Sequence, residues 1–171
     1  MGSGRYSKEE SWSREADRRV TNTHVFEYDR DIRRGHNDKG ERVEPKVHPR
    51  LDIKGQIRES RDYEGVPSLA IGILFDVTGS MSDIPRVLQK TLPSLMGILQ
   101  DLHLTQDNPQ VLFGAFGDTR SDRFPIQIGQ FEADNRMEED MLRIIVEGNG
   151  GPSGEESYEL ALHTMGTRTR I

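Results

Sequence analysis

The stretch LAIGILFDVTGSM, residues 69–81, decides the fold of this chain. From Leu69 to Phe75 it contains no polar side chain, and it then ends abruptly in Asp76. A strand that is apolar on both faces is typical of a central parallel strand, because helices cover both sides of such a sheet. Gly79 is a turn residue. The sequence therefore predicts a buried strand whose carboxyl end carries a polar loop.

The residues after this loop have the spacing of an amphipathic helix. Apolar residues recur at three- and four-residue steps from Ile84 to Leu102, and Pro93 should kink this helix or split it. A second buried strand is predicted at residues 111–116, ending in Gly117 and Asp118. Two buried strands separated by a helix favour a parallel pair with a right-handed crossover.

The remainder of the chain continues the alternation of strands and helices. In residues 125–131 apolar and polar side chains alternate, which predicts a half-exposed edge strand in a hairpin with the strand before it. Helical patterns follow at 135–146 and from about Glu155, on either side of a glycine-rich loop at 147–154. This order predicts an α/β fold, Rossmann-like, with a mostly parallel sheet and one antiparallel edge strand in a three-layer sandwich.

The residues before this pattern have a different composition. Residues 1–65 combine dense mixed charge with few apolar neighbours, which predicts a charged N-terminal arm that is extended or partly disordered. In this arm Phe26 and Tyr28 could share one face of a short strand. The loosely spaced apolar residues Val47, Leu51, Ile53 and Ile57 are expected to anchor the arm on the domain formed by residues 66–171.

Composition excludes several partners. The chain of 171 residues has a formal net charge of −6, and the acidic excess lies after Glu64, so nucleic acid is not an expected partner. There is no apolar run of membrane-spanning length, and no membrane association is expected. The lack of cysteine is compatible with a reducing compartment, and we expect a cytoplasmic protein.

The loop after the first strand has the donors of a cation site. Asp76, Thr78 and Ser80 offer a carboxylate and two hydroxyls at alternate positions, where ligands of open α/β sheets lie. Such hard oxygen donors favour Mg²⁺ or Mn²⁺, and Ca²⁺ less. A structural alternative is that Asp76 and Ser80 only cap the following helix. The strand and helix that flank the motif favour the metal site.

These residues resemble a known family. IGILFDVTGSM, residues 71–81, is similar to the first strand and metal-ion-dependent adhesion site of von Willebrand factor A-type domains, whose D-x-[ST]-x-S motif matches Asp76, Thr78 and Ser80. The resemblance extends over roughly residues 67–171. It includes the Phe116-Gly117-Asp118 segment and the glycine-rich loop that ends in Glu155-Glu156-Ser157.

The resemblance implies further ligands and a role. It implies that Glu156, with Glu155 as its rival, completes the metal site, although both could simply favour a helix N-terminus. Asp118 is a candidate ligand that could equally be a turn residue. The family's next strand, with its loop aspartate, has no counterpart before Ile171, so the resemblance predicts an incomplete domain. An incomplete sheet would expose an apolar edge and favour an oligomer or a larger assembly.

The function implied is metal-dependent protein–protein interaction. The module would bind a partner's carboxylate through the cation, as in scaffold or adhesion modules of intracellular bacterial and phage assemblies, and would not be an enzyme. Two alternatives stay open. One is a metal-dependent hydrolase with Asp118 as general base, and the other is a structural protein with a vestigial metal motif.

Overall fold

The computed structural model describes residues 6–21, 26–81, 87–88, 91, 95, 98–99, 109–148 and 157–171, without the side chains of 18–21 and 80. The described elements are α1 (Lys8–Thr21), α2 (Glu27–Arg34), β1 (Arg58–Glu59), β2 (Leu69–Asp76), the 3₁₀ turn η1 (Gly79–Met81), β3 (Pro109–Phe116), β4 (Ile126–Ile128), α4 (Arg136–Leu142), α5 (Tyr158–Arg168) and β5 (Thr169–Arg170). These elements make an α/β protein, as the sequence predicts. Most of the helix predicted between residues 84 and 102 lies outside the described residues.

The main sheet has the order β2-β3-β4. β2 and β3 are parallel and stay in register from Leu69 opposite Pro109 to Asp76 opposite Phe116. β4 pairs with β3 in the antiparallel direction, so the parallel pair and the antiparallel strand are both confirmed. A second, two-stranded parallel sheet joins β1 to β5.

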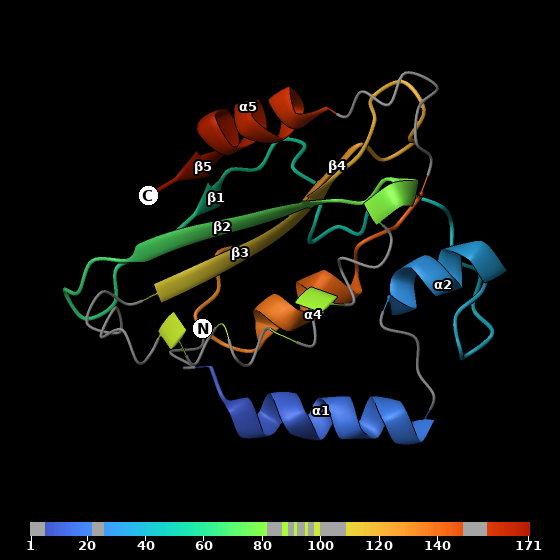
Figure 1. The fold of residues 1–171 in the computed structure, drawn as a ribbon, viewed down its shortest axis with the longest axis horizontal. Helices are drawn as coiled ribbons and strands as arrows, with labels where there is room; N and C mark the ends of the chain where they lie inside the picture. The colour runs from blue at the N-terminus through green and yellow to red at the C-terminus, as the bar shows by residue number, and fades with distance from the viewer. Residues whose placement is uncertain are drawn as a thin grey trace.

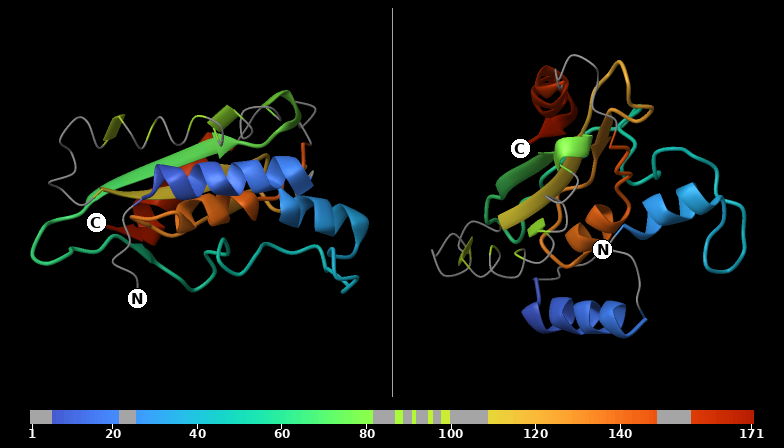
Figure 2. Two further views of the ribbon diagram at one scale, coloured as in Figure 1. Left: turned by 90° about the horizontal axis from the view of Figure 1, so that it is seen from below. Right: turned by 45° about the vertical axis from the view of Figure 1, so that its right-hand side comes forward.

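Helices lie on both faces of the main sheet (Figures 1 and 2). On one face Phe75 and Phe113 pack with Met137 and Met141 of α4 in the larger core cluster. On the other face Met165 of α5 packs against the smaller cluster that includes Leu112, Ile128 and Phe131. Consecutive strand residues alternate between these two clusters, because side chains of a strand point to opposite faces. No helix in the described part of the chain is long and apolar enough to cross a membrane.

The edge strand β4 is more buried than the sequence predicts. Gln127 was expected to face solvent, yet its side chain is fully buried. Its amide donates to the carbonyl of Ile145 and accepts the N–H of the same residue, both at 2.9 Å. Ile128 donates its N–H to the carbonyl of Leu51, also at 2.9 Å. The residues after α4 and the segment around Leu51 therefore cover β4, which the alternating pattern predicts to be half exposed.

Two predicted helices are shorter than their patterns. α4 ends at Leu142, and Ile144 and Ile145 remain buried outside the helix. The β-branched run Ile144-Ile145-Val146 favours extended backbone, which accounts for the early end. α5 begins at Tyr158, and the predicted start near Glu155 lies outside the described residues.

The N-terminal segment differs from the predicted extended arm. Residues 8–21 and 27–34 form the helices α1 and α2, and Tyr28 lies in α2, not in a short strand. Tyr6, Phe26 and Leu51 belong to the larger core cluster, while Val47 and Ile53 pack against the two clusters and Ile57 is exposed. A few apolar residues, spaced far apart, thus attach a charged segment whose composition alone predicts little burial. The domain boundary near residue 65 stays a prediction.

Candidate metal site at the carboxyl end of the sheet

Asp76 closes β2 and starts the candidate site. Its side chain is only 4% exposed, and its Oδ1 accepts the backbone N–H of Thr78 at 2.7 Å. Thr78 is 1% exposed, and its carbonyl accepts the N–H of Met81 at 3.0 Å as the chain enters η1. An aspartate that binds the N–H two residues later folds the backbone into a tight turn. The turn brings residues 76–81 to the end of the sheet.

The second carboxylate oxygen of Asp76 is the unusual feature of this turn. Oδ2 is buried and has no hydrogen-bond partner among the described residues. A buried polar atom without a partner costs about 1–3 kcal/mol, and more when it carries charge. Native structures contain few such atoms, and a bound ion or water is a common reason for one. The chemistry of this orphaned oxygen fits a hard divalent cation.

The predicted glycine-rich loop begins beside this turn. Gly148 donates its N–H to the carbonyl of Val77 at 3.2 Å and has a positive φ of 71°. A Cβ built on Gly79 would lie 2.7 Å from the carbonyl oxygen of Gly148. The two loops that the sequence assigns to the site are therefore in contact at their glycines. Residues 149–156, which include Glu155 and Glu156, lie outside the described residues, as does the side chain of Ser80.

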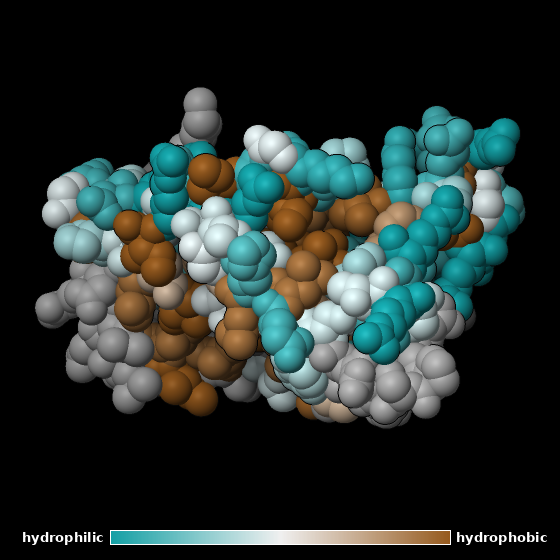
Figure 3. Space-filling model, turned by 90° about the horizontal axis from the view of Figure 1, so that it is seen from above, coloured by the Kyte–Doolittle hydropathy of each residue, from teal (hydrophilic) through white to brown (hydrophobic). Residues whose placement is uncertain are grey.

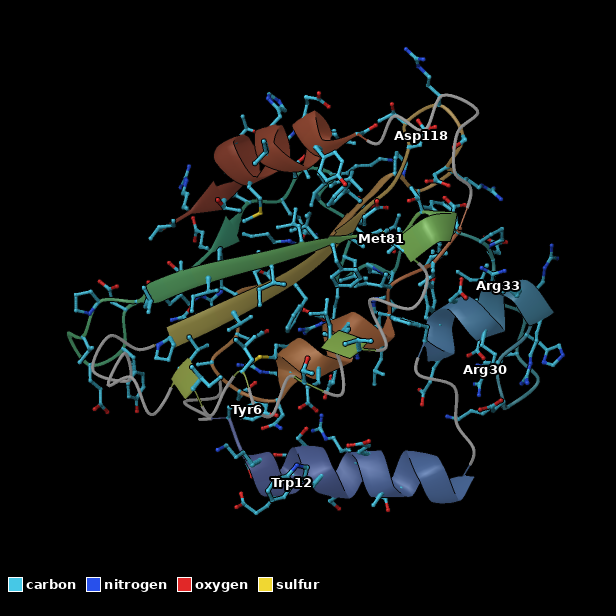
Figure 4. All side chains as sticks on the ribbon, in the orientation of Figure 1. Tyr6, Trp12, Arg30, Arg33, Met81 and Asp118 are labelled. Carbon is cyan, nitrogen blue, oxygen red and sulfur yellow. The ribbon has the colours of Figure 1, made fainter. Side chains whose placement is uncertain are left out.

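Asp118 follows β3 at the same end of the sheet. Figure 4 shows it, with Met81, at the end toward which β2 points. Both of its carboxylate oxygens bind within their own loop: Oδ1 accepts the N–H of Arg120 at 2.8 Å, and Oδ2 accepts the hydroxyl of Ser121 at 2.9 Å. These two donors, the Arg120 N–H first, lower the pKa of Asp118. Asp118 therefore serves here as the turn residue that the sequence allowed as its alternative role.

The N-terminus of α5 contacts the loop of Asp118. The hydroxyl of Ser157 accepts the N–H of Thr119 at 3.1 Å and donates to the hydroxyl of Thr119 at 3.2 Å. The ring of Tyr158 lies 4.9 Å from the ring of Phe116. These contacts bring the residue that directly follows Glu156 in sequence to the carboxyl end of β3. The loops after β2 and β3 and the start of α5 thus gather at one end of the sheet.

Two carboxylates near these loops were not predicted as site residues. Asp122 accepts the N–H of Asp118 through Oδ2 at 2.7 Å, and Glu147 accepts the N–H of Phe124 through Oε2 at 2.8 Å. Burial, together with the nearby Asp122 carboxylate, raises the pKa of Glu147 above its ordinary value, against the opposing Phe124 hydrogen bond. Glu147 is the first residue of the glycine-rich loop at 147–154, and this position is the sequence signal that could have identified it.

The donors of this site are oxygens rather than imidazoles or thiolates. Within the described residues no three His, Cys, Asp or Glu side chains come together as a metal cluster. A cation here would depend on Asp76 together with hydroxyls and with residues of the glycine-rich loop. Comparison of the chain with protein-family models, with curated proteins and with solved structures found no match. The class of protein thus depends on the fold and the loop geometry alone.

Proposed function

We propose that this chain is a metal-dependent protein-interaction module of the von Willebrand factor A type. In this proposal Asp76, Thr78 and Ser80 hold Mg²⁺ or Mn²⁺ at the carboxyl end of a Rossmann-like sheet, and Glu156 completes the site. A partner protein supplies a carboxylate to the remaining coordination position. The bound cation would supply the positive charge that attracts this carboxylate.

The observation that carries the proposal is the buried, unpartnered Oδ2 of Asp76. The other oxygen of the same carboxylate is held by the Thr78 N–H, so the side chain has a fixed orientation. A residue that only caps or shapes a turn needs one oxygen. The second oxygen, buried without a described donor, is better explained by a ligand role than by the turn.

The contact between Gly79 and Gly148 gives independent support. A metal site built from two loops requires those loops to meet, and here the backbones approach closely because neither residue has a side chain. Gly148 of the glycine-rich loop therefore lies beside the turn of Asp76. The proposal assigns Glu156 from the family resemblance.

The arrangement of Asp118 favours a binding role over hydrolysis. A general base must be free to accept a proton from water and works best with a pKa near the operating pH. Both oxygens of Asp118 accept hydrogen bonds, and its pKa is lowered, not raised. We therefore propose a non-enzymatic function for this site.

Calorimetric titration and thermal unfolding with Mg²⁺, Mn²⁺ and Ca²⁺ test the proposal. The unmodified chain should bind Mg²⁺ or Mn²⁺ and unfold at a higher temperature in its presence, because a ligand that binds only the folded state stabilises it. Asp76→Asn keeps an acceptor for the Thr78 N–H but removes the charge. It should weaken metal binding by about tenfold or more and should stabilise the metal-free protein, since it relieves a buried charge.

Asp38→Asn is the matched control for this substitution. Asp38 is an exposed aspartate that pairs with Arg30 and Arg34 at the surface, where ion pairs contribute little. Its replacement should leave metal binding unchanged. The proposal fails if the unmodified chain shows neither binding heat nor a thermal shift with any of the three cations. It also fails if Asp38→Asn and Asp76→Asn weaken binding equally.

A further inference from the structure

The segment after α4 runs to the candidate site without belonging to a helix or a strand. α4 ends at Leu142, and Gly148 touches the turn of Asp76 at Gly79. Figure 3 shows that hydrophilic side chains prevail at this end of the molecule, toward which β2 points. A backbone that lacks regular pairing must bond to side chains or to water. Polar contacts therefore decide where this segment lies.

Side chains from two directions bond to the backbone of this segment. Gln127 of β4 bonds to both the N–H and the carbonyl of Ile145. Asp29 and Arg33 of α2 do the same for Val146: Oδ1 of Asp29 accepts its N–H at 3.3 Å, and Nη2 of Arg33 donates to its carbonyl. Consecutive residues of an extended segment direct their backbone groups to opposite sides, so β4 and α2 hold this segment from either side.

Asp29 and Arg33 act as one unit. They are four residues apart on α2, and Nε of Arg33 donates to Oδ2 of Asp29 at 2.9 Å. Each oxygen of Asp29 thus has its own donor, and the side chain is only 8% exposed. A guanidinium can bond to a carboxylate and a carbonyl at once, because its donors form a rigid fork. We call this pair the α2 clamp.

Two further residues connect the clamp to the candidate metal site. The residue after Val146 is Glu147, which accepts the N–H of Phe124 through Oε2 at 2.8 Å. Gly148 then donates its N–H to the carbonyl of Val77 at 3.2 Å, within the turn that forms the site. The segment is therefore fixed residue by residue, from α2 and β4 to this turn.

We infer that the α2 clamp positions the proposed metal site. By fixing Val146 it holds Gly148, and with it the start of the glycine-rich loop, against the turn of Asp76. The clamp residues touch no cation in this role and act through the loop. The effect on metal affinity rests on the proposed function, whereas the hold on the loop does not. Outer residues that fix the ligands of a metal raise its affinity, because ligands already in place lose less freedom on binding.

The charges of the clamp separate this role from a general electrostatic effect. Asp29 is negative and Arg33 is positive. If the charges acted on the cation through space, removal of Asp29 would weaken binding and removal of Arg33 would strengthen it. If the two residues act by holding the loop, removal of either one weakens binding. The two substitutions to alanine therefore change affinity in opposite directions under one explanation and in the same direction under the other.

Calorimetric titration of the full chain with Mg²⁺ or Mn²⁺ tests the inference. Asp29→Ala and Arg33→Ala should each weaken binding by about tenfold, as the loss of outer contacts to a metal site does. Asp29→Asn keeps an acceptor for the Val146 N–H and should bind more tightly than Asp29→Ala, although both lack the charge. Arg34→Ala is the matched control and should not change the affinity. Arg34 is the next residue of α2, is 53% exposed against 60% for Arg33, and pairs with Asp38 instead.

Amide hydrogen exchange in EDTA tests the hold on the loop without any metal. The Gly148 N–H should exchange about five- to tenfold faster in the two alanine variants of the clamp, because its hydrogen bond opens more often once Val146 is released. In Arg34→Ala its exchange should not change. Amides of the buried strand β3 report global unfolding and should change less than that of Gly148.

Thermal unfolding in EDTA shows whether each variant is folded at the temperature of the titration. There a loss of global stability alone leaves the affinity of the folded protein unchanged. An affinity that is unchanged or higher in Arg33→Ala would overturn the inference, and so would exchange of Gly148 that is equal in all variants. If the unmodified chain binds no cation, the proposed function fails, and the exchange of Gly148 alone decides whether the clamp holds the loop.

Discussion

At the scale of single residues, Gly79 controls how closely the two site loops approach. A Cβ at this position would meet the Gly148 carbonyl at 2.7 Å, and a backbone atom cannot move away as the end of a flexible side chain can. Gly79→Ala should therefore lower the free energy of unfolding by about 1–3 kcal/mol, as overpacking does. Urea unfolding measures this loss.

The matched control for Gly79 is Gly166, a glycine inside α5. A Cβ there meets nothing within 4 Å, and alanine favours a helix over glycine by about 0.5–1 kcal/mol. Gly166→Ala should thus stabilise the protein. If both substitutions change stability by the same amount and in the same direction, the close approach of Gly79 and Gly148 does not matter.

Glu147 should make stability depend on pH in a defined direction. Because burial raises its pKa above the ordinary value of 4.5, the folded protein binds this proton more tightly than the unfolded chain. The associated stability is complete below the ordinary pKa and is lost as the pH rises through the raised value. Glu147→Gln keeps an acceptor for the Phe124 N–H but does not titrate.

The prediction for Glu147 is a difference between two pH profiles. Glu147→Gln should gain stability relative to the unmodified chain as the pH rises above the ordinary carboxyl pKa of 4.5 and the buried glutamate ionises. Urea midpoints at several pH values measure it. Glu44→Gln, at an exposed carboxylate, is the control for the substitution itself. A difference for Glu147→Gln that does not change with pH would contradict the assignment.

At the scale of elements, the N-terminal segment is bound to α4 by polar contacts. Tyr6 donates its hydroxyl to Oε1 of Glu138 at 3.0 Å, in a buried position between α1 and α4 (Figure 4). Burial raises the pKa of the Tyr6 hydroxyl, which therefore stays protonated as a donor. Asn135 accepts the N–H of Ser7 and donates to its carbonyl, as a neighbouring strand would.

Removing one hydroxyl measures the strength of this attachment. In Tyr6→Phe the buried Glu138 would lose the donor to its Oε1, while Oε2 already has none among the described residues. The free energy of unfolding should fall by about 1–3 kcal/mol. Tyr28→Phe, which removes an exposed bond to the Lys46 carbonyl, should cost less than about 1 kcal/mol. Urea unfolding measures both losses. If the two variants lose the same stability, the burial of Glu138 does not raise the cost of removing its hydrogen-bond donor.

At the scale of the whole molecule, the charged N-terminal segment belongs to the same packed body as the sheet. Arg50 bridges two carboxylates of the C-terminal half, Glu132 at 3.1 Å and Asp140 at 2.6 Å. Arg58 is 1% exposed and donates to the carbonyls of Arg50, Asp52 and Ile128. The N-terminal segment therefore completes both the core and the cover of β4.

The sequence alone determined the two parallel strands and the position of the polar loop. The unbroken apolar run that ends in Asp76 predicts a central strand buried on both faces. Among the described residues β2 is instead the terminal strand of its sheet, and its residues 69–74 are partly or fully exposed. The predicted parallel pair and the antiparallel third strand are both present. Among the predicted site residues, Asp76 and Thr78 are buried in the turn, where the motif places them.

Only the tertiary structure decided which polar groups find partners. Gln127 is buried because residues distant in sequence satisfy its amide, and Asp118 is held by its own loop while Oδ2 of Asp76 has no described donor. The helices of the charged N-terminal segment likewise depend on contacts with α4 and β4 rather than on a local pattern. Hydrogen bonds and burial are set by long-range neighbours, and the spacing of residues along one segment does not contain that information.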